Sequence, residues 1–222
     1  DSGDSNDSSS DSSESAELVE LSEIISNPSD QFIVDSDGLA KVSRSHPYMG
    51  SSESCAHAGA HLHFTTDDAP YLINIYAPAD GVISGIDKCY DLGNGNDKYS
   101  VNLIFATHEG SNVSLNLSLE PFAGYLCQDD EDYYSQYILV ENGQSVEKGD
   151  LIAKLYKPDS GDDSTHIHFH VNFDSSIRCP NIFTSSIVSD FADTYGGTTC
   201  DGEEFGETLC YNPAEGEDLT GL

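Results

Sequence analysis

The segment THIHFHV, residues 165–171, places a histidine at every second position. These histidines are His166, His168 and His170. Alternate residues of a β-strand lie on the same face of a sheet, so a strand here would point all three imidazoles the same way. Three adjacent imidazoles are an unusual way to fill a protein core. The pattern therefore predicts a strand whose histidine face has a specific role.

A second cluster, HAGAHLH, covers residues 57–63. His57, His61 and His63 again have even spacing, so one extended strand over about 57–66 would carry them on one face. The residues that follow resemble a hairpin that turns at Asp67–Pro70. Neutral imidazole is a common zinc ligand, and two histidine-bearing strands that meet in one sheet predict a metal site. The alternative is a solvated histidine face, or core histidines that are hydrogen-bonded.

Most of the chain between residues 41 and 178 has the pattern of β-strands. Residues 73–86, 99–119 and 137–156 alternate apolar and polar side chains and are interrupted by glycine-containing turns. Helical periodicity is absent from this region. We therefore expect a single, mostly antiparallel β domain over residues 41–178, with the 165–171 strand inside the sheet and beside the 57–66 strand.

The flanking segments differ in composition. Residues 1–17 are almost entirely Asp, Ser and Glu, which predicts a flexible acidic tail; the alternative is a calcium-binding or assembly arm through which copies of the chain associate. Residues 18–40 predict a short helical strut, with apolar residues at helical spacing, that ends at Asn27-Pro28. Residues 179–222 carry three cysteines and predict a disulfide-rich C-terminal extension without a second core.

Charge and cysteine content limit the function classes. The chain has 8 Lys and Arg against 40 Asp and Glu, a formal net charge of −32, so nucleic acids and anionic membrane surfaces are not expected partners. No apolar run of about 18 residues predicts a membrane span. Six cysteines without a CxxC pair favour up to three disulfides, at least one within 179–210, over free thiols. We expect an extracellular or cell-surface protein. Its acidic tail would then be a spacer between the domain and a lipid anchor attached upstream.

Three motifs occur in a fixed order. APADGV at 77–82 is followed by Gly143 through Ile152 with the pattern G-x-x-V-x-x-G-x-x-I, and then by His166-Ile167-His168-Phe169. With SRSHPYMG at 43–50, these motifs resemble the lysostaphin-type zinc metallopeptidases over about residues 43–173. The resemblance implies the duplicated hybrid motif fold, a β-sandwich-like domain, with zinc as cofactor and a cell-wall peptide or surface polymer as partner.

The resemblance also implies site residues. The second histidine of H-x-H, His168, would bind zinc, and His166 would be the catalytic base or the residue that stabilises the oxyanion. His57 and His61 match the H-x-G-x-D segment, except that His61 stands where the family has Asp. Three histidines with a water in the fourth position are an acceptable catalytic zinc site. An alternative assignment uses His63 and Asp67, which lacks the glycine.

One departure favours a different function. The family carries a further catalytic histidine in a Y-x-H-L strand, and Asn116 stands at the matching position. An amide donates a hydrogen bond but does not shuttle a proton near neutral pH. Two interpretations follow: an extracellular zinc endopeptidase that cuts short peptide cross-links of peptidoglycan, or a catalytically inactive domain of the same fold that acts as a surface-binding or self-assembling structural protein.

Overall fold

The computed structural model describes residues 17–50, 55–159, 164–195, 199–200 and 203–222. The acidic tail, apart from Glu17, and with it the expected assembly arm, lies outside these residues. The strands are β1 (Val19–Glu20), β2 (Val42–His46), β3 (Ala60–Phe64), β4 (Tyr71–Tyr76), β5 (Gly81–Asp91), β6 (Asp97–His108), β7 (Ser111–Glu120), β8 (Ser145–Val146), β9 (Leu151–Lys157), β10 (His166–Phe173), β11 (Ser176–Arg178), β12 (Thr199–Cys200) and β13 (Glu203–Glu204). The helical segments are α1 (Leu21–Ser26), α2 (Ser36–Leu39), α3 (Ser185–Ala192) and the 3-10 turns η1 (Leu126–Gln128), η2 (Tyr133–Tyr137) and η3 (Leu219–Gly221).

One large sheet organises the molecule. Its strands follow the order β2-β3-β10-β7-β6-β5-β8, with β11 added beside β10 and β1 beside β6. All pairs are antiparallel except the two-residue β1, which runs parallel to β6. The prediction of a mostly antiparallel β fold is confirmed. The strand β10, which carries THIHFHV, lies between β3 and β7, so it is internal and adjacent to the other histidine strand, as predicted.

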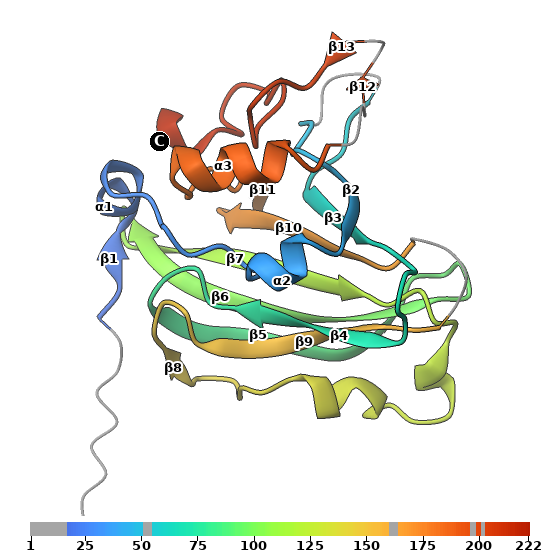
Figure 1. The fold of residues 1–222 in the computed structure, drawn as a ribbon. Coiled ribbons are helices and arrows are strands. Elements are labelled where there is room, and N and C mark those ends of the chain that lie inside the picture. The colour runs from blue at the N-terminus through green and yellow to red at the C-terminus, as the bar shows by residue number, and fades with distance from the viewer. Residues whose placement is uncertain (1–16, 51–54, 160–163, 196–198, 201–202) are drawn as a thin grey trace, which may run out of the picture.

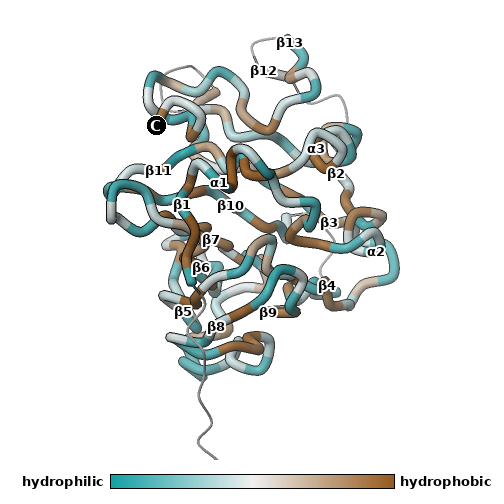
Figure 2. The backbone as a smooth tube through the Cα atoms, turned by 90° about the vertical axis from the view of Figure 1, so that its left-hand side faces the viewer, coloured by the Kyte–Doolittle hydropathy of each residue, from teal (hydrophilic) through white to brown (hydrophobic). Residues whose placement is uncertain are grey.

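A second, two-stranded sheet of β4 and β9 lies against the large one (Figure 1). Ile73 and Ile75 of β4 are opposite Leu155 and Ala153 of β9, and all four join the same core cluster as the apolar residues of the large sheet. This layering gives the expected sandwich-like arrangement. Along the strands, hydrophobic stretches alternate with hydrophilic ones (Figure 2).

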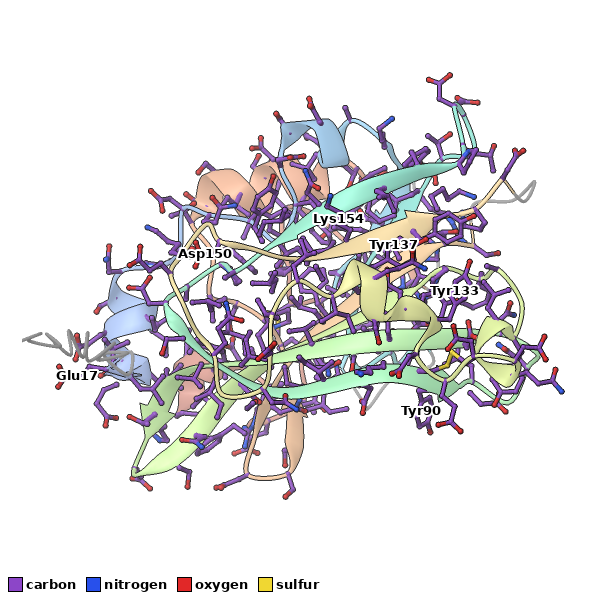
Figure 3. The ribbon with its side chains drawn as sticks, turned by 90° about the horizontal axis from the view of Figure 1, so that it is seen from below. Glu17, Tyr90, Tyr133, Tyr137, Asp150 and Lys154 are labelled. Carbon is purple, nitrogen blue, oxygen red and sulfur yellow. A yellow bond between two sulfur atoms is a disulfide. The ribbon has the colours of Figure 1, made fainter. Side chains whose placement is uncertain are left out.

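Two local strand predictions are wrong. The strands β3 and β4 are joined by a turn at residues 65–70 but do not pair as a hairpin, because β2 and β10 occupy both edges of β3 and β4 pairs with β9. The pattern over residues 137–156 predicts two strands, but only β9 is long, and the other is reduced to the two residues of β8. Tyr137 ends the 3-10 turn η2 (Figure 3), and its ring stacks on that of Tyr156 with centroids 5.6 Å apart.

Both flanking segments pack on the core side of β10. The fully buried ring of Phe169 contacts Phe32 and Phe191 edge to face, each with centroids 6.0 Å apart. Phe32 belongs to the N-terminal strut, in which α1 ends at Ser26, just before Asn27-Pro28 as predicted. Phe191 lies on α3, a helix that the composition of the C-terminal extension did not indicate. The strut and the extension therefore add to the core of the β domain.

Three disulfides use all six cysteines: Cys55–Cys200, Cys89–Cys127 and Cys179–Cys210. The prediction of a bridge within residues 179–210 is confirmed. Cys55–Cys200 joins the segment that precedes β3 to the C-terminal extension. In the part of the chain that the structure covers, no helix has the length and apolar character needed to cross a membrane.

Candidate metal centre

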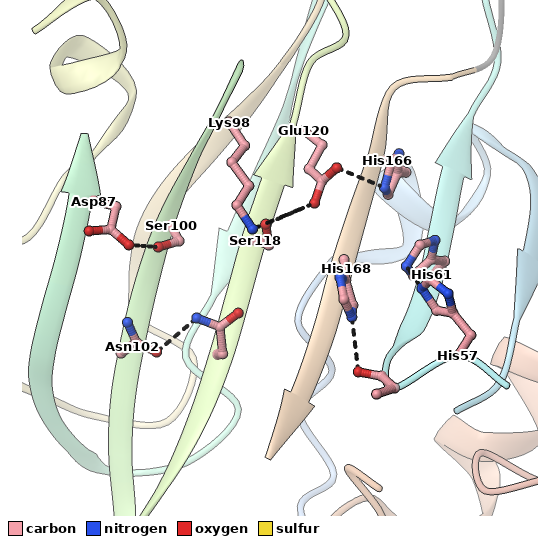
Figure 4. Close-up of polar contacts among 12 residues, drawn as sticks. His57, His61, Asp87, Lys98, Ser100, Asn102, Ser118, Glu120, His166 and His168 are labelled. Atoms are coloured by element: carbon pink, nitrogen blue, oxygen red, sulfur yellow. Dashed lines mark hydrogen bonds and ion pairs between the residues drawn. The ribbon is translucent and has the colours of Figure 1, made fainter. Parts of the chain in front are cut away.

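Strand pairing gathers the histidines on the face of the large sheet that points away from the core. His61 of β3 lies opposite His168 of β10, and His63 lies opposite His166. On the outer side of β3, His46 of β2 lies opposite His61. Leu62 and Phe169, between the histidines, are fully buried in the core. The alternation of polar and apolar residues thus explains why a row of imidazoles forms (Figure 4).

His57 reaches this row from a loop and not from a strand, so the expected continuous 57–66 strand is wrong at its start. The strand β3 begins at Ala60. In an extended chain, residues four apart are separated by about 13 Å, yet Nε2 of His57 lies 2.8 Å from Nε2 of His61. The chain therefore turns back at Ala58-Gly59, and this turn brings His57 onto the histidine face.

Gly59 is required at this turn because the His168 ring occupies the space beside it. A Cβ atom at position 59 would lie 1.6 Å from His168 Nε2 and 2.0 Å from His168 Cδ2. The same Nε2 lies 3.2 Å from the carbonyl oxygen of Ala58. A carbonyl only accepts, so Nε2 carries the proton and the lone pair of His168 is on Nδ1. The loop thereby fixes both the ring and its tautomer.

The residues fit a zinc ion. The ligand atoms of His57, His61 and His168 all lie within 4.8 Å of one another. Tetrahedral ligands with zinc–nitrogen distances of about 2.0–2.1 Å are about 3.4 Å apart, so small side-chain movements would complete such an arrangement. Three imidazoles with an open fourth position are also the donor set of a catalytic zinc site. The structure thus brings together the three residues that the motif resemblance implied as ligands.

Burial keeps these imidazoles neutral, which ligation requires. Loss of hydration lowers the pKa of His168 to about 3, with a further contribution from the nearby His170. Burial also lowers the pKa of His57 and of His61, and the charge of a protonated His166 lowers both further. His61 is only 7% exposed. The three side chains are therefore held in the form that offers a lone pair.

His166 has a different environment, because both of its nitrogens face acceptors. Nδ1 lies 2.7 Å from the carbonyl oxygen of Ser164, and Nε2 lies 3.2 Å from Oε2 of Glu120. Burial favours the neutral acid of Glu120. The hydrogen bond and charge of His166, together with smaller contributions from Ser118 and Lys98, outweigh burial and hold the pKa of Glu120 below its ordinary value. The ring of His166 stacks on His61 with centroids 4.6 Å apart. His166 and Glu120 thus form a buried proton-holding pair beside the ligands (Figure 4).

Three further residues do not join the triad. Asn116 lies opposite His170 and donates to Oδ1 of Asn102 at 2.8 Å, so its amide is directed away from His166. Asp67 is exposed in the turn after β3, and within the described ranges no metal-binding group combines it with His63. His170 is 9% exposed, and its buried Nδ1 lacks a hydrogen-bond partner among the residues described.

Sequence reasoning missed two residues of this site. His46 packs its ring 4.3 Å from that of His61, and its signal was the S-R-S-H alternation before Pro47. Glu120 ends the alternating run S-L-N-L-S-L-E, so a period of two places it on the same face as Asn116. Neither signal indicates which strand lies alongside, and that neighbour determines the contact.

Comparisons with known proteins found likeness only at the level of structure. No protein-family model and no curated protein matched the chain. Among solved structures, lysostaphin in solution is 14% identical with a TM-score of 0.39, over 68% of this chain and 53% of that one. A zinc-containing peptidase from Vibrio cholerae is 17% identical with a TM-score of 0.39, over 68% and 39%. The antimicrobial peptidase lysostaphin from Staphylococcus simulans is 15% identical with a TM-score of 0.38, over 79% and 60%.

The chain therefore matches at most 60% of the length of these proteins. Because the TM-scores lie below 0.5, this likeness does not bear on what the chain binds or catalyses.

Proposed function

We propose that this chain is an extracellular zinc-binding domain that hydrolyses short peptide cross-links in cell-wall peptidoglycan. The observation that carries the proposal is the convergence of His57, His61 and His168, with ligand atoms within 4.8 Å of one another, next to the pair of His166 and Glu120. Sequence motifs shared with the lysostaphin-type metallopeptidases support the substrate class. The three disulfides support an oxidising, extracellular location, and a lipid anchor upstream of the tail remains part of the proposal.

His57, His61 and His168 would hold the zinc. A zinc ion bound there would polarise a peptide carbonyl and lower the pKa of a bound water. The backbone carbonyl of Ala58 orients the ring of His168 through Nε2, which is the usual way in which a second hydrogen bond fixes a ligating imidazole. Gly59 provides the space that this ring needs.

His166 and Glu120 would manage the proton that peptide hydrolysis requires. The amine that leaves a cleaved peptide bond must gain a proton, and Nε2 of His166 and Oε2 of Glu120 hold one between them at 3.2 Å. Ser118 donates to Oε1 of Glu120 at 3.0 Å, and Lys98 lies 4.0 Å from the same oxygen. These contacts hold the carboxylate toward His166, and the carbonyl of Ser164 holds the other side of the ring.

A second candidate is an inactive domain of the same fold that binds a surface polymer or assembles with other copies. The observation that favours it is Asn116, which stands where the motif resemblance implies a further catalytic histidine and which donates to Oδ1 of Asn102 instead. Such a domain would retain the metal as a structural element.

The test measures metal and hydrolysis in the same samples. Bound zinc is determined by elemental analysis, and cleavage of glycine-rich and wall-derived peptides is followed by mass spectrometry. We expect one zinc per chain and cleavage in the parent, loss of cleavage in His168→Ala, and loss of cleavage with zinc retained in His166→Ala. His108→Ala is the matched control, because His108 packs against Phe173 away from the cluster. Zinc without cleavage in the parent would support the second candidate.

A further inference from the structure

The histidine face holds more imidazoles than one zinc site uses. His46 and His63 belong neither to the triad of His57, His61 and His168 nor to the pair of His166 and Glu120. Both lie on strands, and both are near His61, with ring centroids 4.3 Å and 5.6 Å from it. The ligand atoms of His46, His61 and His63 lie within 4.8 Å of one another, as they do in the first triad.

Hydrogen bonding gives His46 an available lone pair. Its Nδ1 lies 3.0 Å from the carbonyl oxygen of Pro47, which only accepts, so Nδ1 carries the proton and Nε2 has the lone pair. This is the arrangement in which a backbone carbonyl orients a metal-binding imidazole.

His63 already faces a cation. Its Nδ1 lies 3.4 Å from Nη2 of Arg44. A guanidinium only donates, so this nitrogen of His63 presents its lone pair. The His63 side chain is 8% exposed, whereas Arg44 is exposed and lies at the outer edge of the sheet on β2. The guanidinium can therefore move into solvent when another cation approaches His63.

We propose that His46, His61 and His63 form a second binding site for a divalent transition metal such as zinc, which shares His61 with the first site. A neutral imidazole has one lone-pair nitrogen, so His61 binds one ion at a time and the two sites are used in alternation. Three neutral nitrogen ligands suit zinc and its neighbours in the first transition series. The inference rests on the proposed function only because both sites use His61. Metal binding at the second site requires no hydrolysis.

The test is the metal content of single and double variants of the full chain. After equilibrium dialysis against zinc, elemental analysis should find one zinc per chain in His168→Ala, because the second site remains. His168→Ala/His46→Ala should hold none, whereas the matched control His168→Ala/His108→Ala should still hold one. Cobalt(II) absorption should differ between His168→Ala and His46→Ala, because each variant retains a different ligand set.

Two results would overturn the second site. One is the absence of zinc from a folded His168→Ala when the parent holds one ion, and the other is retention of zinc by His168→Ala/His46→Ala. If His168→Ala does not fold, His57→Ala takes its place, because it removes a ligand of the first site that lies on a loop and not on a strand. Failure of the proposed function has a different signature, namely a parent that binds zinc and cleaves no wall peptide.

Discussion

Replacing Gly59 with alanine tests whether the loop that precedes β3 builds the metal site. The new Cβ would lie 1.6 Å from Nε2 of His168, and ordinary contact begins at 3.4 Å, so the two must separate by about 1.8 Å. Metal–ligand distances tolerate about 0.2 Å. The φ angle of Gly59 lies outside the positive range in which side chains are strained, so the effect is purely steric. The His168 ring or the loop must move, and either movement separates His168 from His57.

The expected result is a loss of zinc affinity with a modest loss of stability. Displacing a ligand should weaken binding by at least the factor of about 10–100 that follows disruption of a residue supporting a ligand. Overpacking should cost about 1–3 kcal/mol of unfolding free energy. Zinc affinity is measured by competition with a chromophoric chelator in chains that also carry His46→Ala, which removes the second site. Stability is measured by urea unfolding of the metal-free chain.

Gly221→Ala is the matched control, since a Cβ at position 221 meets no atom within 4 Å. It should leave both quantities unchanged. In chains that also carry His46→Ala, zinc binding by the Gly59→Ala variant as tight as without it would refute the reasoning, because His168 could then not be a ligand in the position described.

Three other changes test the fold and the state of the cluster. Phe169→Ala should cost about 3–5 kcal/mol of unfolding free energy in urea, because the fully buried ring joins Phe32 and Phe191, whereas Leu72→Ala, 44% exposed, should cost less than about 0.5 kcal/mol. Replacing both Cys179 and Cys210 with serine opens a loop that spans 31 residues and should cost about 3–4 kcal/mol, read from the thermal midpoint. The metal-free chain should lose stability below pH 6.5, because His46, His168 and His170 have pKa values of about 4, 3 and 4 when folded and about 6.5 when unfolded. Between these pKa values the unfolded state binds more protons than the folded state. The free energy of unfolding therefore falls as the pH drops below 6.5, by about 2 kcal/mol per histidine at pH 5. A urea midpoint equal at pH 7 and pH 5 would contradict this.

Residue alternation was enough to predict the strand that carries THIHFHV, and the expectation that the two histidine clusters meet at a metal site placed this strand beside β3. Along β10 the period of two separates Ile167, Phe169 and Val171, which are fully buried, from the three histidines. Local alternation works there because one face of the strand is buried in the core and the other face is polar.

The same reasoning failed where tertiary contacts decide the local conformation. His57 has the even spacing of a strand residue, but the ring of His168 fills the space next to Gly59 and the chain turns there. The turn at residues 65–70 was identified correctly, yet its flanking strands join different sheets. Glu120 contacts His166 only because β7 pairs with β10 in a register that alternation does not specify.

The charges around the cluster determine what the site can do. If zinc bound to three neutral imidazoles, its ligands would not offset its two positive charges. A site with a carboxylate in place of His61 would offset one of them. The carboxylate that contacts the cluster, Glu120, is engaged by His166, Ser118 and Lys98. Compensation then comes mainly from the field of a chain with a net charge of −32, which acts over longer range and attracts cations to the molecule. A metal bound there with uncompensated charge would be a stronger Lewis acid, next to the pair of His166 and Glu120. These properties are consistent with the hydrolysis that we propose.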